Sequence, residues 1–412
     1  MGKISCRTGI MRTVRQMHTI YLDHAATTPI APEVRETVAQ AMEECWGNPS
    51  SLHLFGRKAR DLLDEARVTV AGALGCLDAE IFFTSSGTES DNMAIFGAAR
   101  VAPLHRRHLV TTAIEHHAVL HACQRLQQEG WDVTYLPVDH YGMVDPDNVR
   151  RAIREDTWLV SVMHANNEVG TVQPVREIAA ICRERGIWLH CDAVQTFGLI
   201  DLKVDDLGVD MLSVSAHKIY GPKGAGALYL RGGVKIAPLL VGGAQEREMR
   251  AGTENVPAIA GFAKAVELSQ TRYLSASERI WQLRERLRTL LQERIPDMQV
   301  NGHPQHHHPG ILSVTLEGVS AESLLIALDR RGIAASAGAA CSAGSIEPSH
   351  VLLALGMSEE RAMSTIRLSV GRGNTPEEID LAAEVIAQEV RRLRCTQDNP
   401  PSLEPHPVVG SR

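Results

Sequence analysis

Short apolar runs alternate with segments of helical spacing through the first half of the chain, and this alternation constrains the fold more than any other feature. Runs of strand length occupy residues 81–84, 108–112, 133–136, 159–163, 187–190 and 211–214. Helical spacing occupies residues 89–99, 118–129, 146–153 and 174–185. Strands that alternate with helices form mainly parallel sheets covered on both faces, and such sheets bind ligands beyond the carboxyl ends of their strands. The pattern therefore predicts an α/β fold whose functional residues follow the strands.

The flanking regions add helices and a second, smaller unit. At the N-terminal side we expect helices at residues 32–44 and 57–74, the second ending at Gly75. A helix that runs past Gly261 through residues 272–294 has a charged face and should bridge the two units. After it, an α+β domain is predicted from strands at residues 311–316 and 367–370 and helices at residues 321–331 and 376–394.

These patterns divide the chain into five expected segments. They are a disordered tail at residues 1–18, an N-terminal segment at 19–30 that packs with the small domain, a large domain at 31–265, a small C-terminal domain at 266–396 and a disordered tail at 397–412.

Composition favours a soluble, cytoplasmic protein. The net charge of −7 argues against a nucleic-acid surface, and no apolar run has membrane-spanning length. The eight cysteines show neither a Cys-x-x-Cys pair nor zinc-site spacing, so reduced thiols are expected. The basic first 18 residues can also be read as a transit peptide, but a tail upstream of Met17 is the preferred reading because their amphipathicity is poor.

Lys218 follows the predicted strand at residues 211–214 among small and polar neighbours. A lysine held there can lose its proton and attack a carbonyl to give a Schiff base; the alternative is a solvated surface lysine. Asp192 ends the preceding strand, and its alternative is a strand-end cap. Pyridoxal phosphate enzymes need such a pair, because the lysine binds the aldehyde and the aspartate keeps the pyridine nitrogen protonated.

The sequence Ser-Ala-His-Lys-Ile-Tyr-Gly-Pro-Lys-Gly at residues 215–224 closely resembles the lysine motif of the cysteine desulfurases. These are pyridoxal 5'-phosphate (PLP) enzymes of the class V aminotransferase family, and the resemblance extends from about Tyr21 to Leu393. It implies the PLP-dependent transferase fold type I, with a mainly parallel seven-stranded sheet and a smaller α+β C-terminal domain. The implied activity converts L-cysteine to L-alanine and passes the sulfur through an enzyme persulfide to an acceptor protein, such as an iron–sulfur cluster scaffold.

The resemblance also assigns the residues that hold the phosphate of PLP. Gly87 and Thr88 match one part of this site, in a Ser-Ser-Gly-Thr sequence that is also an ordinary helix cap. Ser215 and His217 match further phosphate contacts. Thr253 matches a threonine that reaches the phosphate from a second subunit, which implies a homodimer with shared active sites.

The ring of PLP is assigned a second group of contacts. Gln195 and Asn167 resemble residues that hydrogen-bond its phenolic oxygen and its substrate side, and His116 matches the histidine that stacks on the ring and shuttles protons. His117 and His121 have the i, i+4 spacing of a metal pair, but a solvated helix face is the preferred reading and no metal is assigned.

Cys341 is the expected catalytic nucleophile. It lies in a run of small residues at 334–345 that matches the catalytic loop of the family; the alternative is a packed helix start with an inert cysteine. The following Ile-Glu-Pro-Ser-His at residues 346–350 indicates the group I subclass, which includes the nitrogen-fixation and iron–sulfur housekeeping enzymes of the NifS and IscS type. A Cys341 persulfide could then contact a transferred iron–sulfur cluster.

Arg367 matches the arginine that binds the substrate carboxylate, a task suited to bidentate guanidinium geometry, and its alternative is a surface ion pair. His24 is assigned no role, and the histidines at residues 306–308 are interpreted as an exposed loop, with adventitious metal binding as an alternative.

Two other functions remain open on the sequence. A selenocysteine lyase or another PLP-dependent lyase or aminotransferase would use the same frame. A sulfur-carrier platform without PLP chemistry is the non-enzymatic alternative, against which the presence of both Lys218 and Asp192 counts.

Overall fold

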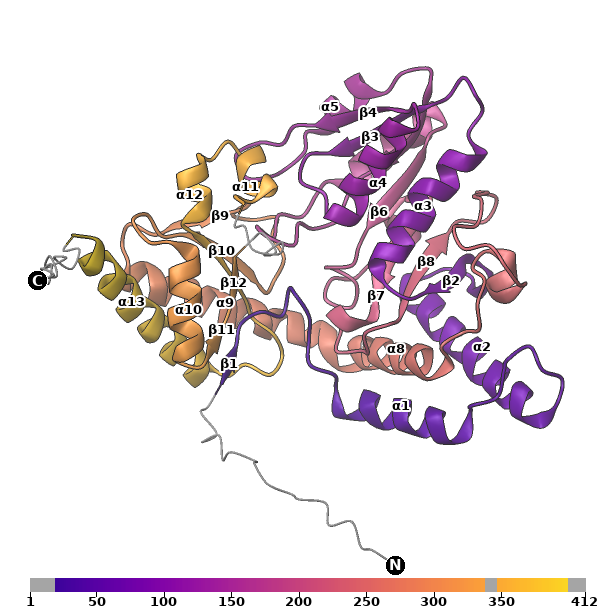
Figure 1. Ribbon diagram of the computed structural model, residues 1–412, viewed down its shortest axis with the longest axis horizontal. Helices are drawn as coiled ribbons and strands as arrows, with labels where there is room; N and C mark the ends of the chain where they lie inside the picture. The colour runs from indigo at the N-terminus through magenta and orange to yellow at the C-terminus, as the bar shows by residue number, and fades with distance from the viewer. Residues whose placement is uncertain (1–18, 338–346, 399–412) are drawn as a thin grey trace, which may run out of the picture.

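The computed structural model describes residues 19–337 and 347–398, and a seven-stranded sheet dominates this part of the chain. The strand order is β2-β8-β7-β6-β5-β3-β4. Figure 1 shows this sheet with α3 (Gly87–Val101) and α4 (His117–Gln128) packed along it. The strands are β2 (Ile81–Thr84), β3 (His108–Thr112), β4 (Asp132–Leu136), β5 (Thr157–Ser161), β6 (Trp188–Asp192), β7 (Met211–Ser215) and β8 (Gly226–Leu230). β8 runs antiparallel to both neighbours and the other pairs are parallel, so the predicted mainly parallel sheet is confirmed.

Each face of the sheet packs in its own hydrophobic core. Because side chains alternate between the two faces, successive residues of one strand belong to different cores. Leu109 of β3 packs in the core under α3 and α4, whereas Val110 packs in the core on the other face. The second core is covered by α2 (Leu54–Leu74), α5 (Pro146–Ala152), α6 (Val175–Arg185) and α8 (Val256–Leu268). The sheet is therefore buried on both sides, as the apolar runs predict.

The helices begin and end where local chemistry requires. α1 (Pro32–Glu44) has Pro32 in its first turn, and α2 ends at Gly75, whose φ of 71° is a left-handed cap. Short elements in the same part of the chain are η1 (Asp78–Glu80), α7 (Val204–Leu207), η2 (Ala216–Lys218) and η3 (Gln245–Glu248).

A four-stranded antiparallel sheet of order β12-β13-β10-β9 forms the C-terminal part (Figure 1). It consists of β9 (Gln299–Asn301), β10 (Ile311–Thr315), β12 (Ser336–Ala337) and β13 (Thr365–Ser369). Its own core includes residues of α9 (Leu274–Arg294), α10 (Ala321–Arg330) and α13 (Pro376–Asp398), while α11 (His350–Ala354) and α12 (Glu359–Met363) are short. α13 continues two residues into the predicted C-terminal tail.

A continuous helix and a strand pair are among the connections between the two described parts. α8 continues through the π-helical residues Ser269–Tyr273 into α9, which is the long bridging helix that the sequence predicts. The N-terminal β1 (Ile20–Tyr21) pairs in parallel with β11 (Ile333–Ala334), so the start of the described chain lies against the C-terminal part. The boundary between residues 265 and 266 stays a prediction.

The prediction missed β8, because its Gly-Ala-Leu-Tyr-Leu sequence directly follows the loop that closes the lysine motif. Within the two described ranges, no helix is both long enough and apolar enough to cross a bilayer.

Candidate active site

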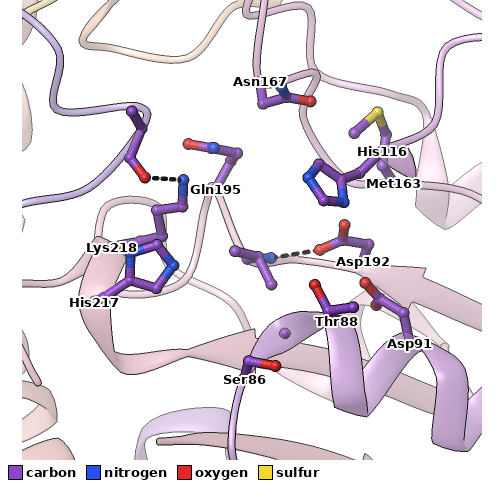
Figure 2. A pocket seen from close by; sticks show the side chains of 13 residues that line it. Ser86, Thr88, Asp91, His116, Met163, Asn167, Asp192, Gln195, His217 and Lys218 are labelled. Carbon is purple, nitrogen blue, oxygen red and sulfur yellow. Dashed lines mark hydrogen bonds between the residues drawn. The ribbon is translucent and has the colours of Figure 1, made fainter. Parts of the chain in front are cut away.

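A cavity of about 210 Å³ opens beyond the carboxyl ends of the parallel strands. Loops after five strands line it: Ser86, Gly87 and Thr88 follow β2, His116 follows β3, Met163 and Asn167 follow β5, Asp192 and Gln195 lie at the end of β6, and His217 and Lys218 follow β7. The position is the one at which α/β sheets bind ligands. Figure 2 shows Lys218 on one side of this cavity and His116 with Asp192 on the other.

Lys218 lies in η2, and its amine points into the cavity (Figure 2). Nζ donates hydrogen bonds to the carbonyl oxygens of Ala25 and Ala26, the second at 2.9 Å. Burial lowers the pKa of this amine to about 7, and the nearby charge of Arg367 adds to the effect. A neutral, nucleophilic amine is therefore accessible near neutral pH.

Asp192 faces Lys218 from the end of β6 and is only 7% exposed. Burial raises its pKa to about 6, while the N–H of Val194, at 2.9 Å from Oδ1, and the charge of Lys218 oppose the rise. Asp91 of α3 lines the same cavity, is fully buried, and has its pKa raised by burial and by Asp192. Burial therefore disfavours the ionised form of both carboxyls. A positively charged group beside Asp192, such as the protonated pyridine nitrogen of PLP, would stabilise the carboxylate form of Asp192.

The N-terminus of α3 forms one end of the cavity. Ser86 caps the helix by accepting a hydrogen bond from Glu89 N–H, so the sequence forms an ordinary helix cap. A Cβ on Gly87 would lie 2.5 Å from Cγ2 of Val194, so only glycine fits. Directly behind it, Ser215 Oγ is buried and has no hydrogen-bond partner among the described residues. Backbone N–H groups, a helix dipole and an unpartnered hydroxyl together suit an anion.

His116 is the N-cap of α4, with its ring accessible from the cavity. Nδ1 accepts a hydrogen bond from Ala118 N–H at 3.1 Å, so the proton of the neutral ring is on Nε2. Burial, followed by the charge of Lys218, lowers the pKa of His116 to about 4. The ring is therefore neutral at neutral pH and can donate from Nε2.

Gln195 and Arg367 connect the cavity to the surrounding chain. Gln195 Nε2 donates to Ala25 O at 3.0 Å. Arg367 on β13 is 5% exposed, pairs with Asp23 at 2.9 Å and donates to Asn167 O at 2.8 Å. Its Nε is buried without a partner among the described residues. Arg367 thus lies beside Asn167 rather than in an exposed ion pair.

Among the predicted site residues that the structure describes, Ser215 and Arg367 lie beside this cavity without lining it, and Thr253 lies away from it. Thr253 lies in a separate cavity of about 180 Å³ with Arg250 and Glu254. Cys341 lies outside the described residues.

Two histidines of α4 have the i, i+4 spacing of a metal pair. His117 and His121 are exposed, with ring centroids 5.0 Å apart, and His350 brings a third ring to within 4.7 Å of His117. Among the residues with assigned positions, no group of three or more His, Cys, Asp or Glu side chains could hold a metal ion.

The prediction of an exposed loop at residues 306–308 is wrong for His308, which is 5% exposed. The sequence could not show this, because the carbonyl group that the ring contacts belongs to Gln195, 113 positions earlier in the chain. Asp91, Met163 and Ala26 were also missed as cavity residues. Asp91 could have been found, since it lies one helical turn after Gly87 and so on the same face of α3.

The comparisons with known proteins agree with this geometry. The family model for aminotransferase class-V matches residues 20–381. The cysteine desulfurase IscS of Methanosarcina thermophila is 49% identical over 375 residues, which cover 91% of this chain and 93% of that protein. A solved NifS-like protein has a TM-score of 0.86 at 38% identity, covering 91% of this chain and 100% of that one. A structure of SspA in complex with cysteine has a TM-score of 0.77 at 36% identity, covering 87% and 100% of the two chains. The chain therefore belongs to the aminotransferase class-V family and, within it, to the cysteine desulfurases.

Proposed function

We propose that this protein is a PLP-dependent cysteine desulfurase that converts L-cysteine to L-alanine. The observation that carries the proposal is the placement of Lys218 and Asp192 in one cavity, with the pKa of the lysine lowered to about 7 and the carboxylate buried. Family membership and the structure of SspA with cysteine support the choice of substrate.

The residues present fit PLP. The N-terminus of α3 at Gly87 and Thr88, with Ser215 and His217 beside it, would hold the phosphate. Lys218 would hold the aldehyde carbon, and Asp192 would pair with the ring nitrogen. When bound, PLP withdraws electrons from the substrate Cα and so makes its proton acidic.

The protein's own groups bind the substrate and move its proton. Arg367 would bind the carboxylate of cysteine by donating hydrogen bonds to it, with Asn167 beside it. The guanidinium is held in place by Asp23, and its Nε has no partner in the described chain. Lys218, as a neutral amine, would accept the Cα proton. His116, neutral with its proton on Nε2, would donate a hydrogen bond across the cavity.

The sulfur step is assigned to Cys341. Its thiolate attacks the substrate sulfur, an S–S bond forms, and the Cβ–S bond breaks with its electron pair remaining on carbon. Protonation of that carbon gives alanine, and the enzyme keeps the sulfur as a Cys341 persulfide. The balance is one thiol and one cysteine giving one persulfide and one alanine, with no external oxidant.

We further propose a cytoplasmic homodimer in which Thr253 of each chain reaches the phosphate site of the other. Its place in a second cavity, away from Lys218, supports this arrangement. The persulfide sulfur would pass to an acceptor protein, of which an iron–sulfur cluster scaffold is the proposed example.

The test is anaerobic turnover of L-cysteine and L-selenocysteine by the PLP-loaded protein, with alanine measured for each. We expect alanine from cysteine, and none after Lys218→Ala. Alanine from selenocysteine alone would replace the proposal with a selenocysteine lyase. A purified protein that neither takes up PLP nor forms alanine would favour the non-enzymatic alternative.

A further inference from the structure

His308 is buried, and both of its ring nitrogens have partners. Nδ1 accepts a hydrogen bond from Gly310 N–H at 3.1 Å, and Nε2 lies 3.0 Å from the carbonyl oxygen of Gln195. A carbonyl oxygen can only accept, so Nε2 carries the ring proton and donates it. The two contacts together fix one neutral tautomer of the ring.

Two backbone hydrogen bonds fix the segment around His308 to the loop that follows β5. His308 N–H donates to Gly170 O at 2.7 Å, and Val172 N–H donates to His306 O at 2.9 Å. These partners belong to the loop after β5 that also carries Asn167. At the other end, Gly310 O accepts from Val370 N–H at 2.9 Å, just after the strand that carries Arg367. His308 therefore lies where the two parts of the molecule meet.

The carbonyl that His308 contacts belongs to a residue of the cavity. Gln195 is 8% exposed, lines the cavity and donates from Nε2 to Ala25 O, which also accepts from Lys218. The same turn begins at Asp192, whose carboxylate accepts from Val194 N–H. A shift of the Gln195 carbonyl would therefore displace groups that face Lys218.

We propose that His308 is a positioning residue, whose Nε2–H bond to the Gln195 carbonyl holds the turn of residues 192–195 in the geometry that the site requires. The inference rests on the proposed function, because PLP is the ligand that this turn would contact. It concerns a residue that the sequence pattern placed in an exposed loop.

The surroundings keep the ring neutral. Burial lowers the pKa of His308 to about 4, with the bond to Gln195 opposing the shift and the charges of His307, Arg284 and Lys218 adding to it. The donor is thus supplied without a further positive charge beside Lys218 and Arg367. A lysine or arginine could supply the donor only together with such a charge.

The experiment compares His308→Leu, which removes the donor, with His308→Gln, whose side-chain amide can still donate. His306→Leu is the matched control, because it makes the same change at an exposed position of the same segment. Each protein is loaded with PLP, and three quantities are measured: the pH midpoint of the visible absorbance of bound PLP, kcat and KM for cysteine, and the thermal unfolding temperature.

We expect His308→Leu to shift the spectral midpoint by about half a pH unit or more and to lower kcat about tenfold, with KM changed less than about twofold. His308→Gln should restore most of both quantities, and His306→Leu should match the wild type. An unchanged midpoint in His308→Leu would overturn the proposal. So would a His308→Gln protein that unfolds at the wild-type temperature but behaves like His308→Leu.

If His308→Leu does not fold, His308→Asn replaces it, because its amide is too short to reach the Gln195 carbonyl; a wild-type midpoint in that variant overturns the proposal. Failure of the proposed function looks different, since wild-type protein would then bind PLP without forming alanine. The spectral comparison would still decide the role of His308.

Discussion

The amine of Lys218 donates a hydrogen bond to the carbonyl oxygen of Ala26 at 2.9 Å (Figure 2). Ala26 belongs to the N-terminal segment, in which Ala25 N–H donates to Ser369 Oγ of β13 at 2.9 Å. The position of the amine is therefore determined jointly by the strand that precedes it and by a segment packed on the smaller sheet. Burial, with the nearby charge of Arg367, lowers the pKa of this amine to about 7, so its neutral form is accessible near neutral pH.

The first prediction concerns the pH dependence of PLP uptake. The pKa of Lys218 is lowered to about 7, so its amine gains a proton below this pH and is neutral above it. Binding of PLP through the amine should be about tenfold faster at pH 8 than at pH 6. Stopped-flow absorbance of the apo-protein mixed with PLP measures the rate. A rate that rises only above pH 9 would contradict the account, because that is the behaviour of an ordinary lysine.

The second prediction concerns Glu115, a fully buried carboxyl beside the cavity. Burial raises its pKa to about 8, against the opposing bonds from Thr112 Oγ1 and Met163 N–H. In the unfolded chain Glu115 loses its proton near pH 4.5, whereas in the folded chain it keeps the proton up to about pH 8. Its contribution to the free energy of unfolding therefore decreases as the pH rises between these two values.

Glu115→Gln keeps an acceptor oxygen for both bonds and cannot ionise. Its free energy of unfolding relative to wild type should increase by about 3.5 kcal/mol between pH 5 and pH 8. Urea denaturation at the two values measures this, with the exposed Glu43→Gln as the control. If the difference in free energy of unfolding between Glu115→Gln and the wild type is the same at both pH values, Glu115 is ionised in the folded protein.

The third prediction compares two glycines. Gly87→Ala would place a methyl group 2.5 Å from Val194 and displace the turn after Asp192, so PLP affinity should fall at least about tenfold. Gly72 is exposed within α2, and outside the backbone of that helix no described atom lies within 4 Å of the point that a Cβ would occupy. Gly72→Ala should therefore stabilise the fold by about 0.5–1 kcal/mol without changing PLP binding. Fluorescence titration with PLP and thermal unfolding test both. Equal PLP affinity in the two variants would show that the close approach at Gly87 is not needed.

The fourth prediction concerns Arg367 and the residue that orients it. Arg367→Lys cannot make two parallel hydrogen bonds to a carboxylate, so its KM for cysteine should rise by about tenfold to a hundredfold. Asp23→Asn removes the charge that holds the guanidinium and should also raise this KM. Arg286→Lys, in an exposed pair with Asp380, is the control and should leave KM unchanged. A normal KM in Arg367→Lys would remove the proposed carboxylate contact.

Much of the fold and part of the site could be predicted from local patterns. Apolar runs with loops after them located the strands, and the ends of those strands located Lys218 and Asp192, whereas His116 was assigned through the family resemblance. The pattern could not locate contacts that depend on tertiary packing. Arg367 pairs with Asp23 from 344 positions away, and His308 meets Gln195 from 113 positions away. Neither partner leaves a signal in its own neighbourhood of the sequence.

The most direct test of the central claim is mass spectrometry of the PLP-loaded protein after anaerobic addition of L-cysteine, with alanine measured in the same sample. The account predicts one additional sulfur atom on the peptide that contains Cys341, together with alanine. Cys341→Ala should still bind PLP but form neither product, and Lys218→Ala should also form neither. Full alanine and sulfide release by Cys341→Ala, or sulfur found on another cysteine, would contradict it.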